Sequence, residues 1–144
     1  MKNLLVLSAL LLSLSVSAAD LVTLSSGSGF GPRVQSSKII ISETGAVVRT
    51  IQTQREVTKE TLGKLSNSAL QNLKDKIEAI EDNAKLVDPN PKAPRCMDAP
   101  SSSVAVNKGG KSIMIYSRSS CHTSTVLDYN AENIVSLIQG LDSL

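Results

Sequence analysis

Apolar and polar residues alternate along residues 46–57, which is the pattern of a β-strand with one buried face. Residues 34–42 precede it and are also expected to form a strand, because they contain three consecutive isoleucines at 39–41. Residues 43–45 between the two strands supply the glycine that a tight hairpin needs. A shorter apolar run at residues 21–24 predicts a first strand, which ends in the glycine- and serine-rich loop 25–32. The first part of the chain therefore predicts a strand followed by a hairpin.

A helical period replaces this alternation after residue 66. Apolar residues recur at intervals of three or four from Leu70 to Ala84, which places one apolar stripe on a helix, and the opposite face carries charges. Ser66 or Ser68 can cap the start of this helix, and Ser68 with Gln71 forms a candidate capping box. The apolar stripe predicts packing against a sheet, and the charged face predicts contact with solvent.

The second part of the chain repeats the order of hairpin and helix without any internal sequence repeat. Three prolines within residues 89–94 exclude helix and central strand there. Residues 103–106 and 111–117 predict a second hairpin, with Ile113 and Ile115 on one face and Met114 and Tyr116 on the other. A final helix is expected from about Asn130, with four buried residues: Ile134, Leu137, Ile138 and Leu141.

The predicted order is thus strand, hairpin, helix, hairpin, helix. Runs of paired strands interrupted by single helices are typical of the α+β class. We expect a small antiparallel sheet of about five strands, with two helices packed on one face and one disulfide.

The chain opens with the three-part layout of a cleavable secretory signal peptide. Lys2 precedes an apolar run of about ten residues, and small residues follow it up to Ala19. Cleavage is expected after Ala19, with the bond after Ala18 as the alternative. The run is too short for a membrane span of about 20 residues. The prediction is a signal peptide over residues 1–19 and a single exported domain over residues 20–144, periplasmic or secreted, with no integral membrane segment after cleavage.

Charge and aromatic content restrict the partners of this domain. Of 15 basic and 13 acidic residues, only Lys2 lies in the signal, so 14 basic and 13 acidic residues remain. A net charge of +1 provides no long-range attraction for nucleic acid or for anionic lipid. Two tyrosines, one phenylalanine and no tryptophan provide few stacking surfaces for bases or sugars. We therefore expect no nucleic-acid partner.

Cys96 and Cys121 are the only cysteines, and an oxidising compartment favours a disulfide between them. In a disulfide the two cysteines have no free thiolate, so they cannot act as metal ligands or nucleophiles. A metal site could be drawn from Cys96, Asp98, Cys121 and His122, but zinc needs thiolates, and the sequence lacks the paired ligand spacings of a metal site. We predict no metal and no cofactor.

A glycine-rich segment and the single histidine are the remaining patterns that could indicate an enzyme, a nucleotide-binding one and a hydrolase respectively. Gly27, Gly29 and Gly31 lead into Pro32 and a strand rather than into a helix that could hold a phosphate. His122 is the only histidine, with serines around it and Asp98 within possible reach through the disulfide. A small hydrolase using His122 is therefore an alternative hypothesis, although no nucleophile elbow accompanies it.

The segment 94–100 is rigid, polar at its ends and covalently braced. A braced loop loses little conformational entropy on binding, which is the physical basis of protease inhibitors that present a fixed extended loop. Arg95, Met97 and Asp98 are the candidate binding residues. The preferred function is a non-enzymatic domain that contacts another protein, with a protease-inhibitor-like loop as its specific form. The alternatives are a structural strap that closes one edge of the sheet, and a structural component of the cell envelope.

Overall fold

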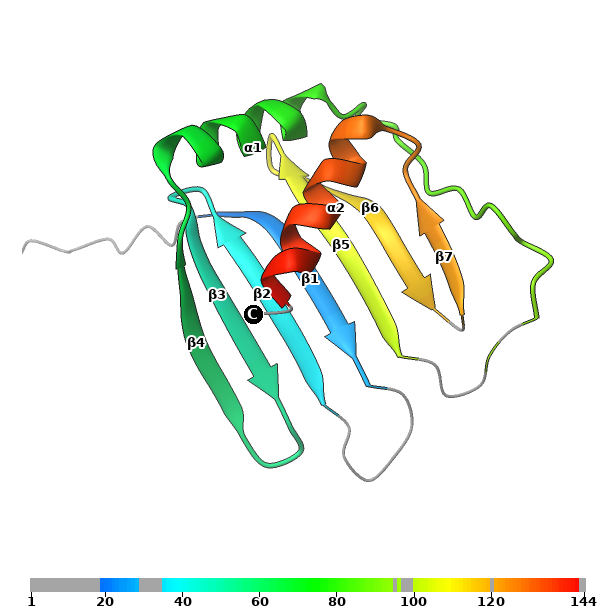
Figure 1. Cartoon of the computed structure of the whole chain (residues 1–144), viewed down its shortest axis with the longest axis horizontal. Coiled ribbons are helices and arrows are strands. Elements are labelled where there is room, and N and C mark those ends of the chain that lie inside the picture. Colours follow the sequence, from blue (N-terminus) through cyan, green and yellow to red (C-terminus); the bar gives the residue numbers. More distant parts are fainter. Residues whose placement is uncertain (1–18, 29–34, 95, 97–99, 120, 143–144) are drawn as a thin grey trace, which may run out of the picture.

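The computed structural model of the chain describes residues 19–28, 35–94, 96, 100–119 and 121–142. Within these residues the chain forms seven strands and two helices (Figure 1). They are β1 (Asp20–Gly27), β2 (Ser36–Ser42), β3 (Ala46–Gln52), β4 (Val57–Lys64), α1 (Asn67–Ala79), β5 (Ser101–Lys108), β6 (Lys111–Ser119), β7 (His122–Thr125) and α2 (Tyr129–Asp142). The predicted signal peptide lies outside the described residues except for Ala19. Neither helix is long and apolar enough to cross a membrane.

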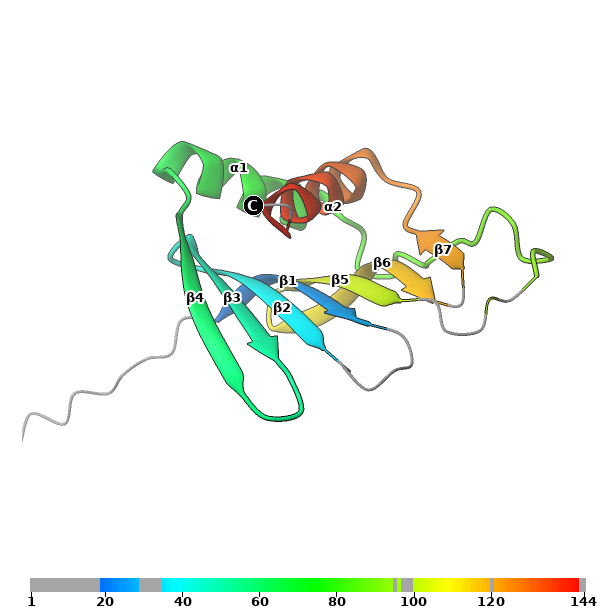
Figure 2. The ribbon, with the colours of Figure 1, turned by 60° about the horizontal axis from the view of Figure 1, so that its bottom comes forward.

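All seven strands join one antiparallel sheet in the order β4-β3-β2-β1-β5-β6-β7. Both helices lie on the same side of this sheet, and no described element covers the other side (Figure 2). The α+β class with two helices and an antiparallel sheet is therefore confirmed. The expected number of about five strands is wrong, because β4 and β7 were not predicted as strands.

Each missed strand has a physical reason. Residues 46–57 are not one strand, since a turn at residues 53–56 is closed by the bond from the Thr53 N–H to the Glu56 carbonyl. The chain then returns as β4, an edge strand that is exposed along most of its length and so lacks an alternating apolar pattern. β7 is only four residues long and consists of polar residues, of which none is fully buried.

The sheet divides into two halves of similar architecture. β1–β4 followed by α1 form an antiparallel meander and a helix, and β5–β7 followed by α2 do the same. β1 and β5 pair antiparallel at the centre, so the strand order is nearly symmetric about their junction. Each helix packs across that junction, because α1 contacts β5 and α2 contacts β1.

The core lies between the sheet and the helices. Leu24 pairs with Ile39 on one side and with Val104 on the other, and all three side chains are buried. A register shift between Val104 and Ala105 lets Ile115 and Tyr116 both turn inward. Placing Tyr116 on the face opposite Ile115 was therefore wrong, whereas Met114 does lie outside the core and is 47% exposed.

The helix starts follow capping chemistry. The Ser66 hydroxyl accepts the N–H of Ala69, so Ser66 rather than Ser68 caps α1. The Asp128 carboxylate accepts the N–H groups of Asn130 and Ala131 and caps α2. In α2 the predicted Ile134 and Ile138 are buried, Leu141 is partly buried, and Leu137 is exposed.

A basic side chain from the sheet meets the C-terminal end of each helix. Lys108 Nζ donates to the Ile80 carbonyl just after α1, at 2.6 Å, and contacts the Asp82 carboxylate at 2.9 Å. Arg49 Nη2 donates to the carbonyl oxygens of Leu141 and Asp142 in the last turn of α2, at 3.0 and 3.1 Å. Cations are favourable at these positions because the terminal carbonyls carry partial negative charge.

Candidate functional site

The segment of residues 87–94, here called the edge strap, runs along the outer edge of β7. Val87 and Thr125 exchange two backbone hydrogen bonds of 2.9 and 3.1 Å. The disulfide Cys96–Cys121 follows the edge strap, with the two Cα atoms 5.4 Å apart, inside the usual range for a disulfide. The predicted disulfide is thus confirmed, and it ties the proline-rich segment to the start of β7.

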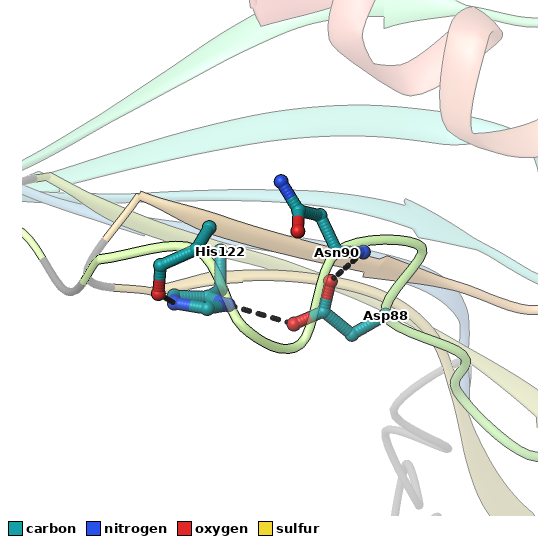
Figure 3. A network of polar contacts seen from close by, with 4 residues as sticks. Asp88, Asn90 and His122 are labelled. Atoms are coloured by element: carbon teal, nitrogen blue, oxygen red, sulfur yellow. Dashed lines mark hydrogen bonds and ion pairs between the residues drawn. The ribbon is translucent and has the colours of Figure 1, made fainter.

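His122 holds the edge strap from β7 through both ring nitrogens (Figure 3). Its Nδ1 lies 2.7 Å from the Asp88 carboxylate, and its Nε2 lies 3.0 Å from the Ala93 carbonyl oxygen. Both partners are acceptors, so a ring that carries a proton on each nitrogen donates to both at once. The histidine therefore spans nearly the whole edge strap.

Asp88 is the acidic partner of His122. Its second carboxylate oxygen accepts the N–H of Asn90 at 2.8 Å, which closes a turn around Pro89. The hydrogen bond from His122, the Asn90 N–H and the attraction of the imidazole lower the pKa of Asp88 below its ordinary value of 3.8. Sequence reasoning missed this residue, although the Asp-Pro-Asn order at residues 88–90 is a recognisable turn signal.

The hydrolase hypothesis needs a hydroxyl bonded to His122 and an acid at Asp98. Among the described residues, no serine or threonine hydroxyl bonds to His122, because Asp88 and Ala93 occupy both nitrogens. Asp98, the acid considered from sequence, lies outside the described residues. The described residues also hold no group of three His, Cys, Asp or Glu side chains that could bind a metal ion.

The predicted binding residues cannot be placed. Arg95, Met97 and Asp98 lie outside the described residues, as do Gly29 and Gly31. Gly27 ends β1. Two residues in or beside the segment 94–100 are described, and both are anchored. The Ala93 carbonyl lies 3.0 Å from His122 Nε2, and Cys96 is bonded to Cys121.

Exposed apolar residues gather where the edge strap meets the start of α2. Leu127 and Tyr129 are each 75% exposed, and Val87 is 42% exposed. We call these three residues the apolar corner. Val87 and Leu127 line a hollow of about 410 Å³ whose rim is charged. Lys76 Nζ lies 5.6 Å from the centre of the Tyr129 ring, which links this corner to α1.

A second feature lies at the other end of α2. A groove of about 480 Å³ opens on the helix side of the sheet, between the strands and the last residues of α2. Two arginines, three serines and one aspartate define what we call the polar groove: Arg49, Arg118, Ser26, Ser37, Ser102 and Asp142. Sequence reasoning did not single out any of these six residues.

Comparison with known proteins adds no further constraint. No protein-family model matches the chain, and neither a curated protein nor a solved structure matches it.

Proposed function

We propose that this chain is an exported, non-enzymatic domain that acts by contact with another protein. The observation that carries the proposal is the apolar corner. Single exposed apolar side chains are common on protein surfaces, but here Val87 and Leu127 line one charged-rimmed hollow, and the exposed Tyr129 lies two residues after Leu127. Apolar anchors inside a polar rim are the usual composition of a protein interface, and tyrosine is frequent among residues that dominate binding.

Two further observations support the proposal. A disulfide is compatible with an oxidising compartment outside the cytoplasm. The single histidine is engaged on both ring nitrogens by Asp88 and Ala93, so its contacts favour a structural role over catalysis. Neither observation depends on the apolar corner, and both agree with a domain that binds rather than reacts.

The experiment compares loss of the apolar corner with loss of a single exposed apolar side chain elsewhere on the surface. The oxidised domain, residues 20–144, is immobilised, and proteins captured from the cell envelope and from the medium are quantified. Leu127→Ser combined with Tyr129→Ser should abolish capture of a specific partner. Val57→Ser, at a 59% exposed position on the far edge strand, should leave capture unchanged. Equal loss in both variants would show that capture depends on general hydrophobicity, which would refute the proposal.

The inhibitor-like form of this function rests on the braced segment 94–100. It is supported by the anchoring of two residues beside Arg95 in the sequence, Ala93 to His122 and Cys96 to Cys121. Arg95→Ala or Met97→Ala should then abolish inhibition of a serine protease while thermal stability stays unchanged. If neither variant alters any interaction, the segment 94–100 continues the edge strap and serves only to close the sheet.

A structural envelope component is a second candidate that the apolar corner also favours, because such a patch can mediate self-association. Sedimentation velocity separates the two. Concentration-dependent assembly that Leu127→Ser abolishes would support the structural component, and a monomer at all concentrations would favour the binding domain.

A further inference from the structure

The polar groove interrupts the core on the helix side of the sheet. In β1, β2 and β5, the buried row Leu24–Ile39–Val104 is followed two residues along by Ser26, Ser37 and Ser102. Residues two apart point to the same face of a strand, so these serines continue the core-facing side. Their hydroxyls form no hydrogen bond with any described residue, so within the described part of the chain three donors on the floor of the groove have no protein partner.

Arginines close the groove at both ends. Arg118 pairs with Ser102 and extends the serine row onto β6. Arg49 lies on the other side, on β3, where it pairs with Ile39. The two positions are separated by four strand spacings of about 4.8 Å each, so their Cα atoms lie about 19 Å apart, with the serine-bearing strands β2, β1 and β5 between them.

The two guanidinium groups differ in mobility. Arg49 is only 13% exposed and is fixed by its bonds to the Leu141 and Asp142 carbonyls, whereas its contact with Glu60 is long, at 3.8 Å. Arg118 is exposed and forms no hydrogen bond or ion pair with another described residue. One cation is therefore preorganised, and the other is free to close on a ligand.

Positive charge outweighs negative charge among the side chains that line the groove. The lining holds two guanidinium groups and one carboxylate, that of Asp142, and its other polar side chains are five serines and Gln35. Arginine binds phosphate and carboxylate oxygens in a planar, two-bond geometry, and hydroxyls can donate to the remaining oxygens of a tetrahedral group. The volume of about 480 Å³ is that of a small-molecule site.

We infer that the polar groove binds a ligand that carries a phosphate or sulfate group, with Arg118 and the three serines as its direct contacts. Arg49 supplies fixed positive charge at the other end of the groove. Asp142 opposes binding, because its carboxylate repels the ligand. The ligand can be a free small molecule or the headgroup of a lipid, since both present the same oxygens.

Binding is measured by calorimetry on the oxidised domain at constant ionic strength, with inorganic phosphate and glucose 6-phosphate as probes and chloride as reference. Arg118→Gln should weaken phosphate binding by about 10-fold or more, because it removes a charge-assisted hydrogen bond. Asp142→Asn should strengthen it. Lys64→Gln removes the same charge at the opposite end of the sheet and should change affinity by less than about 2-fold, as expected for a screened distant charge.

Sedimentation with phosphatidylglycerol vesicles, compared with phosphatidylcholine vesicles, tests the lipid source. Binding to either the free phosphates or the anionic vesicles supports the inference if Arg118→Gln removes it and Lys64→Gln does not. Equal effects of the two variants, or no binding beyond chloride and phosphatidylcholine, would overturn it. Leu127 lies at the other end of α2, so Leu127→Ser should leave phosphate binding intact. The proposed protein contact and the proposed phosphate site can therefore fail independently.

Discussion

Removal of the disulfide should lower the free energy of unfolding, while the protein keeps its folded structure. Cys96 and Cys121 are separated by 25 residues, and on the chain-entropy relation a cross-link of that span removes about 3.5 kcal/mol of unfolded-chain entropy at 25 °C. The native contacts of the edge strap do not depend on the bond, because Val87 and His122 hold it to β7 independently. The loss should therefore appear mainly in the free energy of unfolding.

Urea titration followed by circular dichroism measures this loss. With an m-value of about 2 kcal/mol/M, Cys96→Ala combined with Cys121→Ala should lower the midpoint by about 1.7 M. Reduction of the wild-type disulfide should give the same shift with no substitution. Cys121 has a φ of 65°, so replacing it with glycine instead of alanine should recover about 1 kcal/mol.

Two results would contradict this role of the disulfide. A loss below about 1 kcal/mol would mean that the unfolded chain already keeps the two ends together. Loss of the cooperative transition in both the alanine pair and the reduced protein would mean that the disulfide, rather than His122 and Val87, holds the edge strap in place.

Two further predictions concern the core and the edge strap. Ile39→Ala empties a fully buried position in the centre of the sheet and should cost about 3–4 kcal/mol in urea titration; a cost below 1 kcal/mol would contradict the packing described above. Asp88 has a lowered pKa in the folded state, so its contribution to stability is present above the ordinary Asp pKa of 3.8 and is lost as pH falls through the lower folded value. Wild type should therefore exceed Asp88→Asn in unfolding midpoint at pH 7, with the difference shrinking below pH 3.8; a difference that is independent of pH would exclude a charged Asp88 as the cause.

The hydrophobic pattern was sufficient to predict the strands and helices that bury an apolar face. The alternation over residues 46–57 puts Val47, Arg49 and Ile51 on one face of the strand, and their pairing with β2, where Ile39 and Ile41 are buried, shows that this face turns toward the helices. Arg49 nevertheless occupies a position that the pattern assigns to the core, and only the position of the α2 carbonyls explains why an arginine stands there. A linear pattern carries no information about which helix end will come to lie above a strand.

The edge of the sheet was the harder part to predict. β7 pairs through backbone bonds that polar residues make as well as apolar ones, so no hydrophobic period marks it. The partner of His122 was sought at Asp98, beside the disulfide, whereas the contact is made by Asp88, 34 residues away in sequence. Contacts between a loop and an edge strand depend on how the loop crosses the surface, which neither spacing nor composition determines.

The basic residues at the helix ends link the two halves reciprocally. Lys108 from the second half holds the end of α1, which belongs to the first, and Arg49 from the first half holds the end of α2, which belongs to the second. Opening either half exposes the terminal carbonyls of a helix in the other. Amide hydrogen exchange should therefore show one global opening event shared by α1, α2 and the central strands, and a fragment that carries one half alone should not retain its helix.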